Sequence, residues 1–118
     1  MSAEIIGVFF KFQHLVKLFH WTTLSYSKHI ATDKFIDKIL NLIDKFVEIY
    51  IGKYGRPNVS VKMEIKNLND DEMVTEFKKM IEYLNRLSNK YDKDTDLMNI
   101  RDEMVGEINQ TLYLFTLN

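Results

Sequence analysis

Residues 57–68 read PNVSVKMEIKNL and differ in pattern from the sequence on either side. Apolar side chains recur there at every second position, at Val59, Val61, Met63 and Ile65. This is the period of an extended strand and not of a helix. Twelve extended residues reach about 40 Å, whereas a helix of about 20 residues is about 30 Å long. The segment is therefore long enough to run from one end of a helical bundle to the other.

Helical periodicity fills the chain on both sides of this segment. Apolar residues spaced three and four apart predict two helices before it, over about residues 5–19 and 31–54, and two after it, over about 69–88 and 94–117. The positions that predict the buried faces are Ile5, Phe9, Phe12, Val16 and Phe19, then Ile36, Ile39, Ile43, Phe46, Val47 and Tyr50, then Met73, Val74, Phe77, Ile81, Leu84 and Leu87, and finally Leu97, Ile100, Met104, Ile108, Leu112 and Phe115.

The lengths of the connections indicate how these helices are wired. Residues 23–30 and 88–93 are short linkers of the kind that join antiparallel neighbours, whereas residues 57–68 can cross the whole bundle. Two antiparallel hairpins joined by a long crossover are the wiring of ferritin-like proteins. We therefore predict an all-α, ferritin-like four-helix bundle that forms one domain over residues 1–118. The alternative is a simple up-down bundle with a floppy middle loop.

Composition narrows the classes of function. The chain has 118 residues, no cysteine and a formal net charge of −1. It therefore forms no disulfide, thiolate metal site or thiol nucleophile, and its balanced charge argues against nucleic acid as a partner. We identify no signal peptide and no apolar run of the roughly 20 residues that a membrane span needs. We expect a cytoplasmic protein without a membrane partner, or a virion-associated one if it is viral.

The candidate site lies on the second predicted helix. His29, Asp33, Asp37, Asp44 and Glu48 share one face of that helix if it already includes His29. The two ends of this acidic stripe, His29 with Asp33 and Asp44 with Glu48, are separated by about 16 Å along the helix axis. One helix cannot bring both ends to one ion, but two copies packed antiparallel about a two-fold axis can.

Two interpretations of the acidic stripe stay open. Carboxylates together with imidazole suit iron, manganese or zinc, so the stripe is a candidate metal site. It is equally typical of a solvated helix face, in which Lys34 pairs with Asp37 and Lys45 pairs with Glu48. Like charges four residues apart destabilise an isolated helix by a few tenths of a kcal/mol, and a bound cation reverses that effect.

The same residues resemble the Dps-type mini-ferritins. Phe19-His20-Trp21, then His29-x-x-x-Asp33 and Asp44-x-x-x-Glu48, match the pattern of that family, including the eleven residues from the first aspartate to the second. The resemblance implies a homodimer or larger homo-oligomer that oxidises ferrous iron, as a ferroxidase, at sites shared between two-fold-related subunits. It implies His20, His29, Asp33, Asp44 and Glu48 as metal ligands, with Trp21 and Asp37 near the site.

A second resemblance is to a small uncharacterised family encoded by tailed phages and large DNA viruses. It is carried by His20-Trp21-x-Thr23-x-Ser25-Tyr26-x-x-His29 and by Gly52-Lys53-Tyr54-Gly55-Arg56, and it implies nothing about activity. It leaves a second hypothesis open, a non-enzymatic oligomeric structural or interaction protein that keeps the bundle without metal chemistry. On either hypothesis we interpret Trp21 chiefly as a packing anchor and His14 as a surface residue.

Overall fold

The computed structural model describes residues 2–118, and this part of the chain forms helices and no strand. The helices are α1 (Ser2–Thr22), α2 (Tyr26–Tyr54), α3 (Asp70–Arg86), α4 (Ser88–Tyr91) and α5 (Thr95–Leu114). The predicted all-α fold is confirmed, with four long helices in the described residues. The short α4 lies within residues 88–93, where the sequence predicts only a linker.

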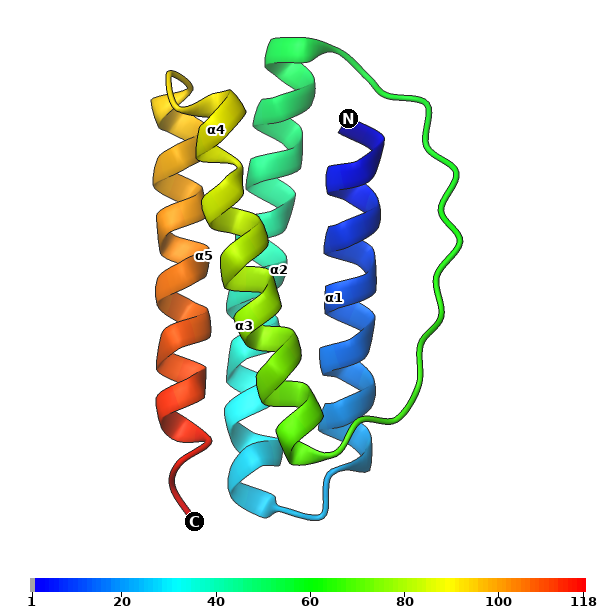
Figure 1. Ribbon diagram of the computed structural model, residues 1–118, viewed down its shortest axis with the longest axis vertical. Helices are drawn as coiled ribbons and strands as arrows, with labels where there is room; N and C mark the ends of the chain where they lie inside the picture. The colour runs from blue at the N-terminus through cyan, green and yellow to red at the C-terminus, as the bar shows by residue number, and fades with distance from the viewer. Residues whose placement is uncertain (1) are drawn as a thin grey trace.

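The four long helices form two antiparallel hairpins that pack against each other (Figure 1). Helix α2 packs against α1 and α5, and α3 packs against α5 and α1. The non-helical residues between α2 and α3, which we call the connector (residues 55–69), leave one end of the bundle and reach the other along the side of α1. The helices that it joins, α2 and α3, therefore run in the same direction, which rules out the alternative of a simple up-down bundle with a floppy middle loop.

Local signals explain where α2 and α3 begin. Helix α2 begins at Tyr26, earlier than the apolar pattern predicts, because the Ser25 side chain accepts a hydrogen bond from the Lys28 N–H at 3.3 Å. Helix α3 begins with a capping box, in which the Asn69 side chain accepts from the Glu72 N–H and the Glu72 side chain accepts from the Asn69 N–H. The early start of α2 places His29 inside the helix, as the acidic stripe requires.

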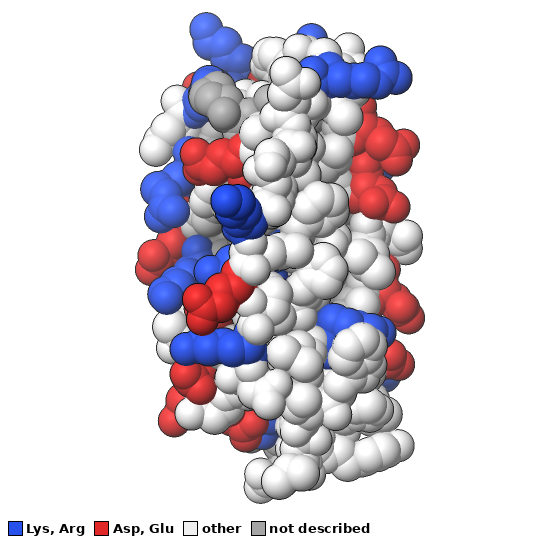
Figure 2. Space-filling model, turned by 90° about the vertical axis from the view of Figure 1, so that its right-hand side faces the viewer, with Lys and Arg blue, Asp and Glu red and all other residues white. Residues whose placement is uncertain are grey.

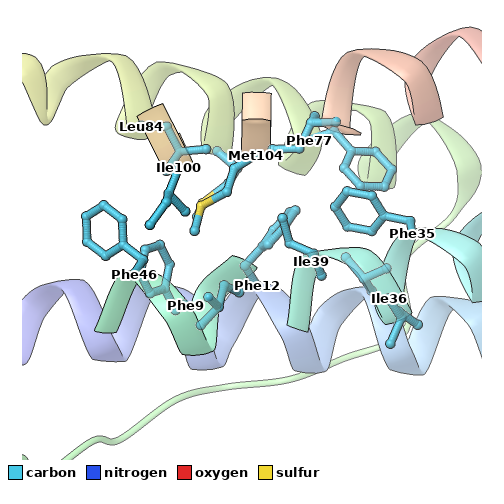
Figure 3. Close-up of a cluster of buried hydrophobic side chains, with 14 of the residues drawn as sticks. Phe9, Phe12, Phe35, Ile36, Ile39, Phe46, Phe77, Leu84, Ile100 and Met104 are labelled. Carbon is cyan, nitrogen blue, oxygen red and sulfur yellow. The ribbon is translucent and has the colours of Figure 1, made fainter. Parts of the chain in front are cut away.

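An aromatic core holds the two hairpins together. Phe12, Phe35 and Phe77 come from α1, α2 and α3 and meet edge to face, with ring centroids 5.3 to 5.9 Å apart. Such pairs contribute about 0.5–1.5 kcal/mol each beyond the area they bury. Figure 3 shows these rings pointing toward one another between the helices, together with Phe9 and Phe46. Every apolar position predicted for a buried face is buried or partly buried.

The connector touches the bundle along one side. A Cβ added to Gly7 of α1 would lie 3.8 Å from a methyl group of Val61, so the segment runs close to the α1 backbone there. Gly55 ends α2 and begins the connector with a φ of 90°, a left-handed conformation that glycine adopts without strain. None of the helices in the described residues is both long enough and apolar enough to cross a membrane.

Candidate functional site

The turn between α1 and α2 brings two histidines into contact. His20 lies in the last turn of α1 and His29 in the first turns of α2. Because the connection is only three residues long, the two helix ends stay adjacent and the imidazole rings stack, with centroids 4.0 Å apart and planes 13° apart. His20 is 6% exposed, whereas His29 is half-buried. The sequence predicts both as candidate ligands, and the structure brings them together.

Hydrogen bonds to the backbone hold both rings in one orientation. The Nδ1 of His20 lies 2.9 Å from the carbonyl oxygen of His29, and the Nδ1 of His29 lies 2.8 Å from the carbonyl oxygen of His20. The hydroxyl of Thr32, 3.0 Å away, also accepts from His20 Nδ1 because it donates its own proton to the Lys28 carbonyl. A carbonyl oxygen only accepts, so each Nδ1 carries a proton. In the neutral rings, the lone pair is therefore on Nε2.

Asp33 lies beside the two rings on the next turn of α2. One of its carboxylate oxygens is 3.8 Å from His20 Nε2, and its side chain is 60% exposed. No buried side-chain nitrogen or oxygen in residues 3–118 lacks a hydrogen-bond partner, so the two Nε2 atoms, which make no hydrogen bond, are accessible to solvent and not enclosed in a cavity. The two rings and the Asp33 carboxylate thus lie at the same end of the first hairpin, and we call the two rings the histidine pair (His20, His29).

The other half of the acidic stripe lies elsewhere. Asp37, Asp44 and Glu48 are exposed further along α2, and about 16 Å of helix separates Asp33 from Asp44. Over the described residues, no group of three or more histidine or acidic side chains lies close enough to hold one metal ion. One chain by itself therefore places His20, His29 and Asp33 at the same end of the first hairpin without forming a complete metal site, and it keeps Asp44 and Glu48 apart from them.

The lysines next to the stripe do not neutralise it. Among the ion pairs of residues 2–118, neither the pair of Lys34 with Asp37 nor that of Lys45 with Glu48 is formed. The intervening Lys38 instead lies 3.7 Å from Glu107 of α5. The acids on this face are exposed, and the specific lysine pairs expected of a solvated face are absent from the described chain.

Large apolar side chains are exposed in and next to the turn that carries the histidine pair. Trp21 is 66% exposed, with the Lys17 ammonium 5.4 Å from its ring, so it is not the packing anchor that the sequence predicts. Leu24 and Tyr26 are also exposed, and the Tyr26 ring lies 6.5 Å from that of His29. We call Trp21, Leu24 and Tyr26 the turn patch. His14, by contrast, is a surface residue as predicted.

A second charged cluster, which the sequence does not reveal, closes the opposite end of α2. The Lys53 ammonium lies 2.7 Å from Asp94 and 2.8 Å from Asp96, and the Tyr54 hydroxyl donates to Asp94 at 2.5 Å. We call these four residues the lysine clamp. Hydrogen bonds from Lys53 hold the pKa of both carboxyl groups below their usual range, and the same contacts raise the pKa of Lys53. In the sequence, this cluster is indicated only by acidic residues at the start of α5 and a lysine at the end of α2.

Comparison with known proteins identifies relatives of the chain. The model of a family described as "Family of unknown function (DUF5856)" matches residues 20–115. An uncharacterised 14.6 kDa protein from the mobD-ri intergenic region of Enterobacteria phage T4 is 29% identical over 118 residues, covering 98% of this chain and 88% of that protein. No solved structure matches. The resemblance to a phage-encoded family is thereby supported, whereas the Dps-type resemblance gains no support from these comparisons.

Proposed function

The chain belongs to the family of unknown function DUF5856, and we propose that it binds ferrous iron at a site shared between two copies and promotes its oxidation. The proposal rests on the histidine pair. Metal-binding imidazoles generally donate their second ring N–H to a carbonyl or carboxylate, which fixes the ring and leaves the other nitrogen for the ion. His20 and His29 both have this arrangement, with Asp33 beside them.

We propose further that the bundle is ferritin-like. Two antiparallel hairpins and a connector that runs along the bundle support this arrangement. In bundles of this kind, carboxylates and histidines on facing helices form the metal sites. Here the acidic stripe instead faces outward from α2, so its partner must be a second molecule.

An antiparallel pairing of two α2 helices completes the site. With the two-fold axis between Lys38 and Ile39, His29 lies opposite the partner's Glu48 and Asp33 lies opposite the partner's Asp44. The same register brings Asp37 opposite the partner's Leu40. Symmetry then gives two equivalent sites per dimer. Each would bring together imidazole, carboxylate and open positions, which suits iron and also accommodates manganese or zinc.

The surface around the site is consistent with a partner. The turn patch is exposed in one chain. A groove of about 230 Å³ on the outer side of α1 and α2 is lined mainly by apolar side chains, among them Val16, Ile36 and Ile39. The apolar side chains that line this groove are largely buried except Leu40, so the exposed apolar surface that can mark an interaction site lies chiefly in the turn patch. A second copy would cover it and bring the carboxylates to the histidine pair.

The proposed chemistry treats iron as the substrate. Each ferrous ion loses one electron, so two ions supply the pair that hydrogen peroxide takes up, with two protons, in becoming two molecules of water. The protein would contribute ligands that hold the ion, neutralise its charge and leave a position open to the oxidant. His20 and His29 would supply imidazole, and Asp33 together with the partner's Asp44 and Glu48 would supply carboxylate.

Removing the distal carboxylates tests the proposal. Protein purified without chelator is titrated aerobically with ferrous iron, and bound metal is counted by elemental analysis. The D44A/E48A variant should lose binding and oxidation, while a control that removes two exposed acids elsewhere, E82A/E103A, should retain both. Equal iron binding by the two variants would contradict the proposal.

The same samples test the second hypothesis. The exposed turn patch favours a structural or interaction protein that oligomerises without metal. Light scattering gives the mass of the assembly for each variant. An oligomer that binds no iron, and whose mass is the same for the wild type and D44A/E48A, would support that hypothesis in place of iron oxidation.

A further inference from the structure

The connector has an extended backbone without hydrogen-bonded neighbours. Across the described chain, residues 56–68 make no backbone hydrogen bond, although they run along the length of the bundle (Figure 1). Exposed N–H and C=O groups along an extended segment are a template for pairing with another strand. The sequence pattern of period two, with apolar and polar residues alternating, is that of a strand in a sheet.

The two faces of the connector differ. Ser60, Lys62, Glu64 and Lys66 are exposed on one face. On the other face, Val61 contacts α1 at Gly7, but Val59 and Met63 each remain 40% exposed. Figure 2 looks at this side of the molecule and shows uncharged side chains gathered in a band along the long axis, with charged side chains on both flanks. The apolar face is therefore only partly covered by the bundle.

We propose that the connectors of two copies pair as an antiparallel two-stranded ribbon, with the two-fold axis at Met63. In this register, Lys62 lies opposite the partner's Glu64, and symmetry repeats that pair. On the other face, Val61 lies opposite the partner's Ile65, and Met63 lies opposite the partner's Met63. Around the axis, opposite charges thus face each other at Lys62 and Glu64, and apolar side chains meet at Val61, Met63 and Ile65, whereas Val59 lies opposite the partner's Asn67.

Neighbouring registers fit less well. Moving the axis to position 62 puts Lys62 opposite the partner's Lys62, and moving it to position 64 puts Glu64 opposite the partner's Glu64. Like charges directly opposite each other destabilise a strand pair. Moving it to position 65 restores opposite charges but places Met63 opposite the partner's Asn67 and Val61 opposite the partner's Asn69, so that apolar pairing is left only at Ile65. Charge and apolar pairing together therefore select the axis at Met63.

This ribbon does not depend on the proposed iron site. None of the proposed metal ligands lies in the connector, and the ribbon needs no ion. A dimer that persists in the presence of a chelator does not need iron, and substitutions in the connector then show whether the connector holds it. Failure of the ribbon leaves the iron proposal standing, and failure of iron binding leaves the ribbon standing.

Single-cysteine variants test the register directly, because the chain has no cysteine of its own. Side chains directly opposite each other in an antiparallel pair have Cβ atoms about 4.5–5.5 Å apart, close to the separation in a disulfide. Under mild oxidation with chelator present, M63C should form a covalent dimer. S60C, an equally accessible thiol in the same segment, should stay monomeric because its two copies would lie about 20 Å apart. Cross-linking of both variants to the same extent, or of neither, would overturn the proposal.

A charge reversal tests the same contact without a thiol. K62E turns the two Lys–Glu pairs into repulsive pairs and should weaken dimerisation about tenfold by analytical ultracentrifugation. K62E/E64K reverses both partners and should restore the wild-type dimer. Lys62 and Glu64 are exposed and lie outside the helices, so these changes should leave the helical content unaltered. Loss of dimer in the double variant as well would contradict the pairing, and so would an undiminished dimer in K62E.

Discussion

The two ends of α2 carry polar clusters of opposite character. At the C-terminal end, the lysine clamp pairs one ammonium with two carboxylates and adds a tyrosine hydroxyl, so its charges are compensated within the chain. At the N-terminal end, the histidine pair uses each Nδ1 for the backbone and leaves each Nε2 toward the surface beside one exposed carboxylate. The compensated cluster joins α2 to α5, whereas each Nε2 of the histidine pair makes no hydrogen bond in the described chain.

Among substitutions at the two ends of α2, removing His20 should lower the free energy of unfolding the most. H20A deletes a nearly buried ring with its stacking contact and its backbone hydrogen bond, and it should lower the free energy of unfolding by about 3 kcal/mol. Urea unfolding at neutral pH measures this. The control H14A changes an exposed ring on α1 and should cost less than about 0.5 kcal/mol. Equal losses in the two variants would show that the His20 contacts do not hold the turn.

Bound metal should stabilise the folded protein through the acidic stripe and the histidine pair, and not through the lysine clamp. At a metal concentration ten times the dissociation constant, binding to the folded protein adds about 1.4 kcal/mol. We therefore expect ferrous iron under anaerobic conditions, or manganese, to raise the melting temperature of the wild type and of K53A. D44A/E48A should show no rise. A rise of the same size in D44A/E48A would place the bound ion somewhere other than the acidic stripe.

Acid should weaken the clamp. Asp94 and Asp96 have lowered pKa values when folded, so their contribution to stability is present above their unfolded pKa of about 3.9 and is lost as the pH falls through the lowered values. The melting temperature of the wild type should therefore fall more between pH 5 and pH 2.5 than that of K53A, in which these shifts are reduced. The control K45A should follow the wild type, and parallel profiles for K53A and the wild type would contradict the clamp.

The smallest change in stability should come from removing the Tyr54 hydroxyl of the lysine clamp. Tyr54 donates to Asp94, and this hydrogen bond helps to lower the pKa of that carboxyl. Y54F keeps the exposed ring and should move the acid transition slightly toward neutral pH, by less than K53A changes it. Thermal melts over the same pH range measure this shift, and a transition displaced toward lower pH would contradict the assigned direction.

Patterns within one helix were predictable, and contacts between distant helices were not. The period of 3.6 in the helices and of two in the connector predicts the order of the four long helices, which the structure confirms, but it does not predict the short α4. The start of α2 at Tyr26 depends on a cap at Ser25, which apolar spacing alone does not reveal. The lysine clamp joins residues 40 or more positions apart, so no local pattern indicates it.

For the candidate site, too, local patterns predict positions on one helix but not contacts with other helices or other molecules. The sequence predicts His29 and Asp33 on one helix face, and the structure places them there with His20 stacked on the first. Trp21 follows His20 directly, yet its side chain is exposed because it lies on the outer side of α1, where the protomer provides nothing to cover it. Whether Asp44 and Glu48 of a second copy reach the histidine pair depends on an interface between molecules and stays a prediction.

Mixing two inactive variants tests the shared site most directly. H29A/D33A lacks the first half of each site and D44A/E48A lacks the second, so neither homodimer should bind iron. After the two are unfolded together in equal amounts and refolded, half of the dimers should be mixed, and each mixed dimer should regain one of its two sites. The account therefore predicts about a quarter of the wild-type iron content in the mixture. No iron in the refolded mixture, or full binding by either variant alone, would contradict a site built from two chains.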